Sequence, residues 1–216
     1  MKEVAIEILK AHTVFAPKKI EDLREKELVK QMMLRRRLTR NAKIMLYLAD
    51  KCGYKGENVV YGSAYGELQA TVGITNAIAQ NTPISPTLFQ NSVYNASPSY
   101  LSLLHKAKGE MITISSGNNT SFATLQTAAL QSLVTSKPVF CVATECFDIE
   151  RIEELNSCSS YLEAGVGAMI VATTKTDNGK SLQTNLAQEG LPPSLKAMAN
   201  LEQMFQQGIQ KMLISL

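Results

Sequence analysis

The segment ITISSGNNTSFATLQ, residues 112–126, is typical of a short strand that turns tightly into a helix. A residue in such a turn sits at the N-terminus of the helix, where backbone N–H groups and the helix dipole lower the pKa of a thiol or hold an oxyanion. The candidate at this place is Asn118, which has no ionisable proton and cannot form a thioester. The turn therefore offers a site for a nucleophile without supplying one.

Hydroxyl groups flank the turn at Ser115, Ser116 and Ser121. A serine nucleophile needs a neighbouring base, and the two histidines of the chain, His12 and His105, belong to no recognisable triad. The run Gly-Asn-Asn-Thr is also simply a good turn and helix N-cap. The residues alone leave both interpretations open.

The composition narrows the class of protein. With 216 residues, of which 45% are hydrophobic, the chain can fill the core of a single domain, residues 1–216. Charged residues make up 19% and the net charge is +3, too weak a field to indicate a nucleic acid or a membrane surface as partner. Four cysteines without a CxxC pair argue against a zinc site and for buried thiols.

The N-terminus does not resemble a signal peptide, and no apolar run approaches the length of a membrane span. We therefore expect no membrane span, no metal and a cytoplasmic location.

Strands and helices must position the turn. Apolar or alternating runs predict strands over residues 2–10, 58–62, 111–115, 137–144 and 165–174. Helical spacing predicts a helical region over residues 31–52 that stops at Gly53, a helix over 67–80, helices that start at Ser85-Pro86 and Ser97-Pro98, and a helix over 120–133. This alternation predicts the α/β class, with a mostly parallel mixed sheet covered by helices on both faces.

The C-terminal segment, residues 192–216, is predicted to be an amphipathic helix that Ser194 caps. Its apolar stripe consists of Met198, Leu201, Phe205, Ile209 and Met212.

Five stretches in a fixed order carry a family resemblance. They are LRRRLTR (34–40), YGSAYGEL (61–68), ISPTLFQNSVYNA (84–96), ITISSGNNTSF (112–122) and EAGVGA (163–168). Through them the chain resembles the N-terminal half of a β-ketoacyl synthase, and more closely the short ketosynthase-like chain length factors of aryl polyene and related polyketide pigment pathways. The resemblance implies a thiolase-like fold, N-terminal half only, and places Asn118 where the catalytic cysteine would be.

The same resemblance implies a function. Both catalytic histidines of the family lie in the C-terminal half, which this chain lacks, so we expect a non-catalytic subunit. It would form a heterodimer with a catalytic β-ketoacyl-ACP synthase and shape its acyl tunnel in polyene, polyketide or fatty acid-type biosynthesis. The expected second partner is an acyl carrier protein, whose phosphopantetheine is the only cofactor implied. The alternative is an independent serine-dependent acyltransferase or hydrolase that acts on an acyl carrier protein substrate.

The resemblance also implies site residues. Those expected at the partner interface and acyl tunnel are Tyr65, Leu88, Phe89, Ser92, Tyr94, Asn95 and Phe122, although plain packing would explain them too. Residues 89–96 and 111–118 are expected to be buried against the ketosynthase. The arginines expected to receive the carrier protein are Arg35, Arg36, Arg37 and Arg40, although such a cluster can also be a solvated helix face.

Overall fold

One mixed β-sheet organises the protein in the computed structural model, which describes residues 3–149, 159–174 and 179–216. Its seven strands lie in the order β3-β2-β4-β5-β1-β7-β6. Their bounds are β1 Glu3–Ala16, β2 Asn58–Gly62, β3 Met111–Ile114, β4 Val139–Cys146, β5 Glu163–Thr173, β6 Lys180–Ser181 and β7 Lys211–Ser215. The five predicted strands are all present.

Half of the strand pairs are parallel and half are antiparallel. β2 runs parallel to β3 and to β4, and β6 runs parallel to β7. β5 is antiparallel to both β4 and β1, and β1 is antiparallel to β7. β1 continues to Ala16, beyond the predicted end at residue 10, because its second half pairs with β5. The α/β class with a mixed sheet is confirmed, but the sheet is not mostly parallel, because the long strand β5 pairs antiparallel with both of its neighbours.

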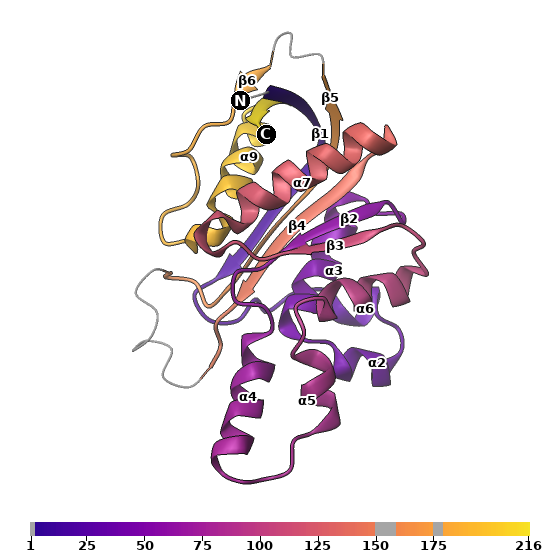
Figure 1. Ribbon diagram of the computed structural model, residues 1–216, viewed down its shortest axis with the longest axis vertical. Helices are drawn as coiled ribbons and strands as arrows, with labels where there is room; N and C mark the ends of the chain where they lie inside the picture. The colour runs from indigo at the N-terminus through magenta and orange to yellow at the C-terminus, as the bar shows by residue number, and fades with distance from the viewer. Residues whose placement is uncertain (1–2, 150–158, 175–178) are drawn as a thin grey trace.

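Helices cover both faces of the sheet (Figure 1). α7 and α9 lie on one face, and α3, with α6 packed against it, lies on the other. The helix bounds are α1 Glu25–Leu28, α2 Met32–Arg37, α3 Arg40–Cys52, α4 Leu68–Ala79, α5 Pro86–Asn91, α6 Ala96–His105, α7 Thr120–Thr135 and α9 Lys196–Gln206.

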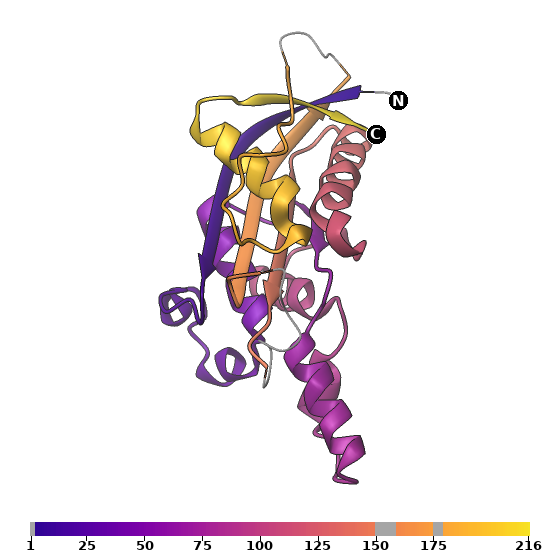
Figure 2. The same ribbon diagram turned by 90° about the vertical axis from the view of Figure 1, so that its left-hand side faces the viewer.

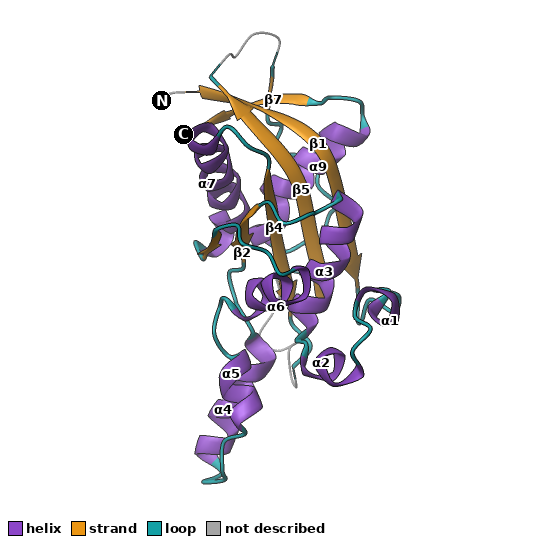
Figure 3. Ribbon diagram, turned by 90° about the vertical axis from the view of Figure 1, so that its right-hand side faces the viewer, coloured by secondary structure: helices purple, strands orange, loops and turns teal. Residues whose placement is uncertain are grey.

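A pair of helices projects from this body. α4 and α5 extend away from the sheet at the end opposite the two chain termini, as Figure 2 also shows. We call residues 68–91, which comprise α4, α5 and their connection, the arm. Figure 3 shows α1, α2 and α6 at the same end of the sheet as the root of the arm.

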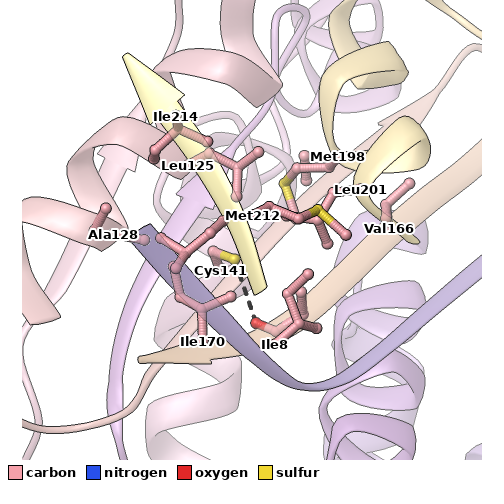
Figure 4. Close-up of a cluster of buried hydrophobic side chains, with 14 of the residues drawn as sticks. Ile8, Leu125, Ala128, Cys141, Val166, Ile170, Met198, Leu201, Met212 and Ile214 are labelled. Carbon is pink, nitrogen blue, oxygen red and sulfur yellow. Dashed lines mark hydrogen bonds between the residues drawn. The ribbon is translucent and has the colours of Figure 1, made fainter. Parts of the chain in front are cut away.

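The hydrophobic core fills the space between the sheet and each helix layer. Figure 4 shows the cluster beneath α7 and α9, where Leu125, Met198 and Met212 converge and the Cys141 thiol donates a hydrogen bond to the Ala168 carbonyl at 3.3 Å. On the opposite face, α3 approaches β5 closely because the strand carries Gly165. A Cβ there would lie 2.6 Å from Ile44 Cγ2.

Two predicted helices begin differently from expectation. The predicted region 31–52 is divided into α2 and α3, because Leu38 is extended and the Thr39 side chain caps α3 by accepting from the Ala42 N–H at 3.1 Å. The predicted stop at Gly53 is confirmed, with φ of 73°. The predicted start at Ser97-Pro98 is wrong: α6 begins at Ala96, and Ser97 is buried with its hydroxyl bound to Glu67.

The prediction of a helix through residues 192–216 is wrong in its second half. α9 ends at Gln206, and Gly208, with φ of 85°, turns the chain into β7. Met212 then points into the core from a strand that pairs with β1. Ser194 caps no helix, because its hydroxyl donates to a buried carboxylate instead.

A buried ion pair joins α3 to the sheet. Glu163 is fully buried and accepts hydrogen bonds from Arg40 Nε at 2.6 Å and from the Ile20 N–H at 2.7 Å. The Arg40 side chain is 11% exposed and also pairs with Glu25 at 3.2 Å. Arg40 therefore serves the fold of the chain itself.

Replacing Arg40 by alanine should destabilise the protein by about 3–5 kcal/mol, because Glu163 would remain buried without its cation. Equilibrium urea unfolding measures this loss. The matched control is Arg36→Ala on the neighbouring exposed helix, which should change the free energy of unfolding by less than about 0.5 kcal/mol. Equal effects of the two substitutions would contradict this assignment.

Candidate functional site

The predicted strand-turn-helix is present. β3 ends at Ile114, a 3₁₀ turn spans Gly117–Asn119, and α7 begins at Thr120. The Thr120 hydroxyl caps the turn, because it accepts from the Ser116 N–H at 3.0 Å and donates to the Gly117 carbonyl at 2.7 Å. Asn118 is therefore not needed as a cap, and it is exposed at the start of a 16-residue helix.

The hydroxyls near Asn118 have no partner base among the described residues. Ser121 is buried and accepts from the Ala197 N–H at 3.2 Å. His12 packs on Tyr47 and His105 on Tyr54, with ring centroids 5.7 and 5.1 Å apart. Burial lowers the pKa of both imidazoles. In the described parts of the chain, neither histidine hydrogen-bonds a serine.

A cavity of about 590 Å³ opens beside the turn. Asn118, Asn119 and Phe122 form one wall, and Lys196 at the start of α9 and Leu213 of β7 belong to the others. The structure thus brings Phe122 together with Asn118. The other predicted tunnel residues lie on the arm or at its root and do not line this cavity.

Two of these residues, Tyr94 and Tyr65, lie at the root of the arm and have different partners there. The Tyr94 hydroxyl donates to the Ala64 carbonyl at 3.2 Å, and Tyr65 packs edge-on against Phe147 with ring centroids 4.9 Å apart. Asn95 immediately precedes α6, and its carbonyl accepts from the Ser99 hydroxyl at 2.7 Å.

The arm itself presents apolar side chains to solvent. Ile78 is 65% exposed and Phe89 is 68% exposed. Leu88 turns inward instead and packs between the two helices against Gly73, where a Cβ would lie 3.3 Å from its Cδ1. Ser92 is half-buried, and its hydroxyl donates to the Phe89 carbonyl at 2.9 Å.

A buried carboxylate that the sequence did not reveal holds the root of the arm. Glu145, at the end of β4, accepts from the Ala64 N–H at 2.7 Å and from the hydroxyls of Ser63 at 2.9 Å and Ser194 at 2.8 Å. Burial raises the pKa of its carboxyl. Glu145 therefore fastens the arm's root to the start of α9, which forms a wall of the cavity.

The predicted arginines fall into two groups. Arg36 and Arg37 are exposed on α2 and Arg35 is half-buried, whereas Arg40 is bound to Glu163. A groove of about 450 Å³ lies beside α2, with Met33 and Leu103 among its lining residues.

The sequence of nearly the whole chain identifies the protein family. Residues 15–213 match the family model described as β-ketoacyl synthase, N-terminal domain. The chain belongs to this family. The resemblance expected from the five motifs is thereby confirmed at the level of the family. No curated protein matches this ketosynthase-family chain closely enough to name as a relative.

Solved structures share the fold. A chain in the complex of the ketosynthase ApeO with its chain length factor ApeC from Xenorhabdus doucetiae is 19% identical, with a TM-score of 0.69 over 92% of both chains. The ishigamide ketosynthase/chain length factor gives 12% identity and a TM-score of 0.60 over 80% of this chain and 63% of that one. The AntDE:AntF complex is a type II PKS acyl-carrier protein with its ketosynthase. Its matching chain is 11% identical, with a TM-score of 0.62 over 79% of this chain and 64% of that one. These likenesses establish the thiolase-like ketosynthase fold.

The described residues give little support to a metal site, a membrane span or a reactive thiol. They contain no group of three His, Cys, Asp or Glu side chains arranged to hold a metal ion. None of the described helices is both long and apolar enough to cross a membrane. Cys52, Cys141 and Cys146 are buried free thiols, and burial raises the pKa of Cys52 to about 12. Cys158 lies outside the described residues.

A third buried carboxylate of this ketosynthase-family chain connects the arm to α3 and α6. Glu67, the residue before α4, accepts from the hydroxyls of Thr39 at 2.8 Å and Ser97 at 2.6 Å. Burial raises the pKa of its carboxyl above the ordinary value of 4.5. The folded state therefore holds the proton of Glu67 at a higher pH than the unfolded state does.

This raised pKa predicts a pH dependence of stability. The contribution of Glu67 to the free energy of unfolding is fully present below the pKa that this carboxyl has in the unfolded chain. It is lost as the pH rises through the higher pKa of the folded protein. Glu67→Gln removes this titration, so the free energy of unfolding should fall less than in the wild type between pH 4.5 and neutrality. Urea unfolding at several pH values measures the slope. The exposed Glu7→Gln serves as the control and should keep the wild-type slope, and an identical slope in Glu67→Gln would refute the assignment.

Proposed function

We propose that this chain is a non-catalytic ketosynthase-like subunit, a chain length factor, that forms a heterodimer with a catalytic β-ketoacyl-ACP synthase and shapes its acyl tunnel. The observation that carries the proposal is the arm. Residues 68–104 contain no Asp, Glu, Lys or Arg, although charged residues make up 19% of the chain. This uncharged stretch includes the whole projecting arm.

The composition of the arm suits an interface. The centre of a protein-protein interface is depleted of charge and enriched in aromatic and apolar side chains, whereas a solvated helical hairpin carries charges. Besides Ile78 and Phe89 on the arm, Val93, which follows the arm, is 49% exposed. Obligate interfaces of this character bury upward of ~2,000 Å² in total.

The sheet supports the same partner. β3 stands at the edge of the sheet, so its outer backbone groups have no neighbouring strand among the described residues. An open edge invites pairing with a strand from another chain. The ApeO–ApeC and ishigamide structures both contain, by their descriptions, a ketosynthase with a chain length factor.

The turn supports the absence of catalysis. An asparagine side chain cannot carry an acyl group as a thioester or ester, and no base lies within hydrogen-bonding reach of the nearby serines in the described residues. The backbone N–H groups at the start of α7 alone supply no proton transfer. No observation favours the independent serine-dependent acyltransferase or hydrolase.

The arrangement of the arm refines the proposed residues. Phe89, Ser92 and Tyr94, which are exposed or half-exposed, would meet the partner's tunnel, whereas Leu88 packs within the arm against Gly73. Arg35, Arg36 and Arg37 would receive the acyl carrier protein, which brings its own phosphopantetheine. Arg40 is left out because it neutralises Glu163. The chemistry served would be polyene, polyketide or fatty acid-type chain elongation.

Enlarging Ser92 to phenylalanine should shorten the products of the assembled complex, because added bulk at the tunnel reduces the space for a growing chain. The chain is co-purified with a β-ketoacyl-ACP synthase of the same organism, and product length is read by mass spectrometry. Val134→Phe is the control, because Val134 is 85% exposed near the end of α7, away from the arm. Products of unchanged length from an assembled Ser92→Phe complex would contradict the tunnel role.

A further inference from the structure

The helix that carries the exposed arginines is held to the body by few side chains of its own: Leu34 packs against the core, and Arg35 donates a hydrogen bond to the Val29 carbonyl at 2.9 Å. α2 has only six residues, and none of them is buried. A helix of this length is unstable by itself, because nucleation is not repaid by enough hydrogen bonds. The position of Arg36 and Arg37 therefore depends on what fixes the ends of α2.

Two buried side chains fix its C-terminal end. The Arg37 carbonyl accepts a hydrogen bond from Asn91 Nδ2 at 3.1 Å, and the Tyr100 hydroxyl lies 3.1 Å from the same oxygen. The Tyr100 hydroxyl is closer to Asn91 Oδ1, at 2.8 Å. Since that oxygen accepts from Tyr100, the amide group of Asn91 is oriented with its NH₂ toward the Arg37 carbonyl.

The clamp, as we call Asn91 and Tyr100, connects separate elements. Asn91 is the last residue of α5 and so belongs to the arm, and Tyr100 lies in the middle of α6. Their exposed fractions are 8% and 7%, so both hydrogen bonds are shielded from water. The root of the arm and the end of the basic helix are thus held together by three polar groups.

We propose that Asn91 and Tyr100 are positioning residues for carrier-protein docking. They hold the end of α2, and with it Arg36 and Arg37, in one place relative to the arm before the carrier protein arrives. This inference rests on the proposed function, which assigns the docking role to these arginines. It adds the residues that make the docking surface rigid.

Rigidity and charge have separable kinetic effects. Long-range attraction between charged surfaces sets the association rate and its dependence on salt, whereas the fit of the bound surfaces sets the dissociation rate. Loosening the clamp leaves every charge of α2 present. Binding must then also order α2 and two long side chains. This ordering costs conformational entropy and weakens the bound state, so the complex separates faster.

The test measures binding of holo acyl carrier protein to the complex of this chain with its ketosynthase, by surface plasmon resonance at several salt concentrations. Tyr100→Phe removes one hydroxyl, and Asn91→Leu replaces the polar amide by an apolar group of similar size. Each should raise the dissociation rate by about three- to tenfold, the effect of one lost hydrogen bond. The association rate and its salt dependence should stay within twofold of the wild type. Gln90→Ala, an exposed neighbour on α5, is the matched control.

A double variant with Arg36→Glu and Arg37→Glu separates this inference from the proposed function. It should lower the association rate and flatten its salt dependence. If this variant binds like the wild type, carrier docking on α2 is wrong.

If the charge reversal weakens binding but Tyr100→Phe keeps the wild-type dissociation rate, the clamp is refuted while docking stands. A merely structural role would lower the active fraction of the complex and leave both rate constants unchanged, which also refutes the clamp. Should Asn91→Leu fail to fold, the conservative Tyr100→Phe decides the question alone.

Discussion

The carboxylate of Glu145 is the group on which the arrangement of the candidate site depends. A buried carboxylate is costly unless hydrogen-bond donors replace the lost water. Here the donors come from the loop before the arm, through Ser63 and the Ala64 N–H, and from Ser194 just before α9. Neither segment can move without leaving part of the carboxylate unsatisfied. The arm, the cavity beside Asn118 and the sheet are therefore held in one geometry.

Glu145 and Glu163 act from opposite faces of the sheet. They lie on paired strands, with Glu145 opposite Ala164 and Cys146 opposite Glu163, so the alternation of side chains sends the two carboxylates to different sides. Glu163 holds α3 through Arg40, and Glu145 holds the segment leading into α9. Glu67 adds a third anchor at the base of α4. The end of the sheet from which the arm and the basic helix emerge is thus rigid, which suits a surface that receives partners.

The sequence predicted what local patterns determine. Alternation and apolar runs located the strands, Gly53 marked a helix end, and the strand-turn-helix around Asn118 was correct because its signals lie within fifteen residues. The C-terminal helix was overextended, because Met212 fits a helical stripe yet pairs as a strand with β1, a partner more than 200 residues away. Arg40 was grouped with Arg36 for the same kind of reason, since its partner Glu163 lies 123 positions away. Glu67 and Glu145 gave no local signal, because their donors gather only in the folded protein.

The central claim is that the uncharged arm is buried against a ketosynthase. Amide hydrogen exchange of this chain, measured alone and after mixing with a β-ketoacyl-ACP synthase of the same organism, tests it directly. The account predicts that exchange in residues 68–91 slows at least about tenfold in the mixture, while the buried strands β4 and β5 keep the protection they already have. A mixture that co-elutes as a complex but leaves the exchange of residues 68–91 unchanged would contradict the account, and so would the failure to form any complex.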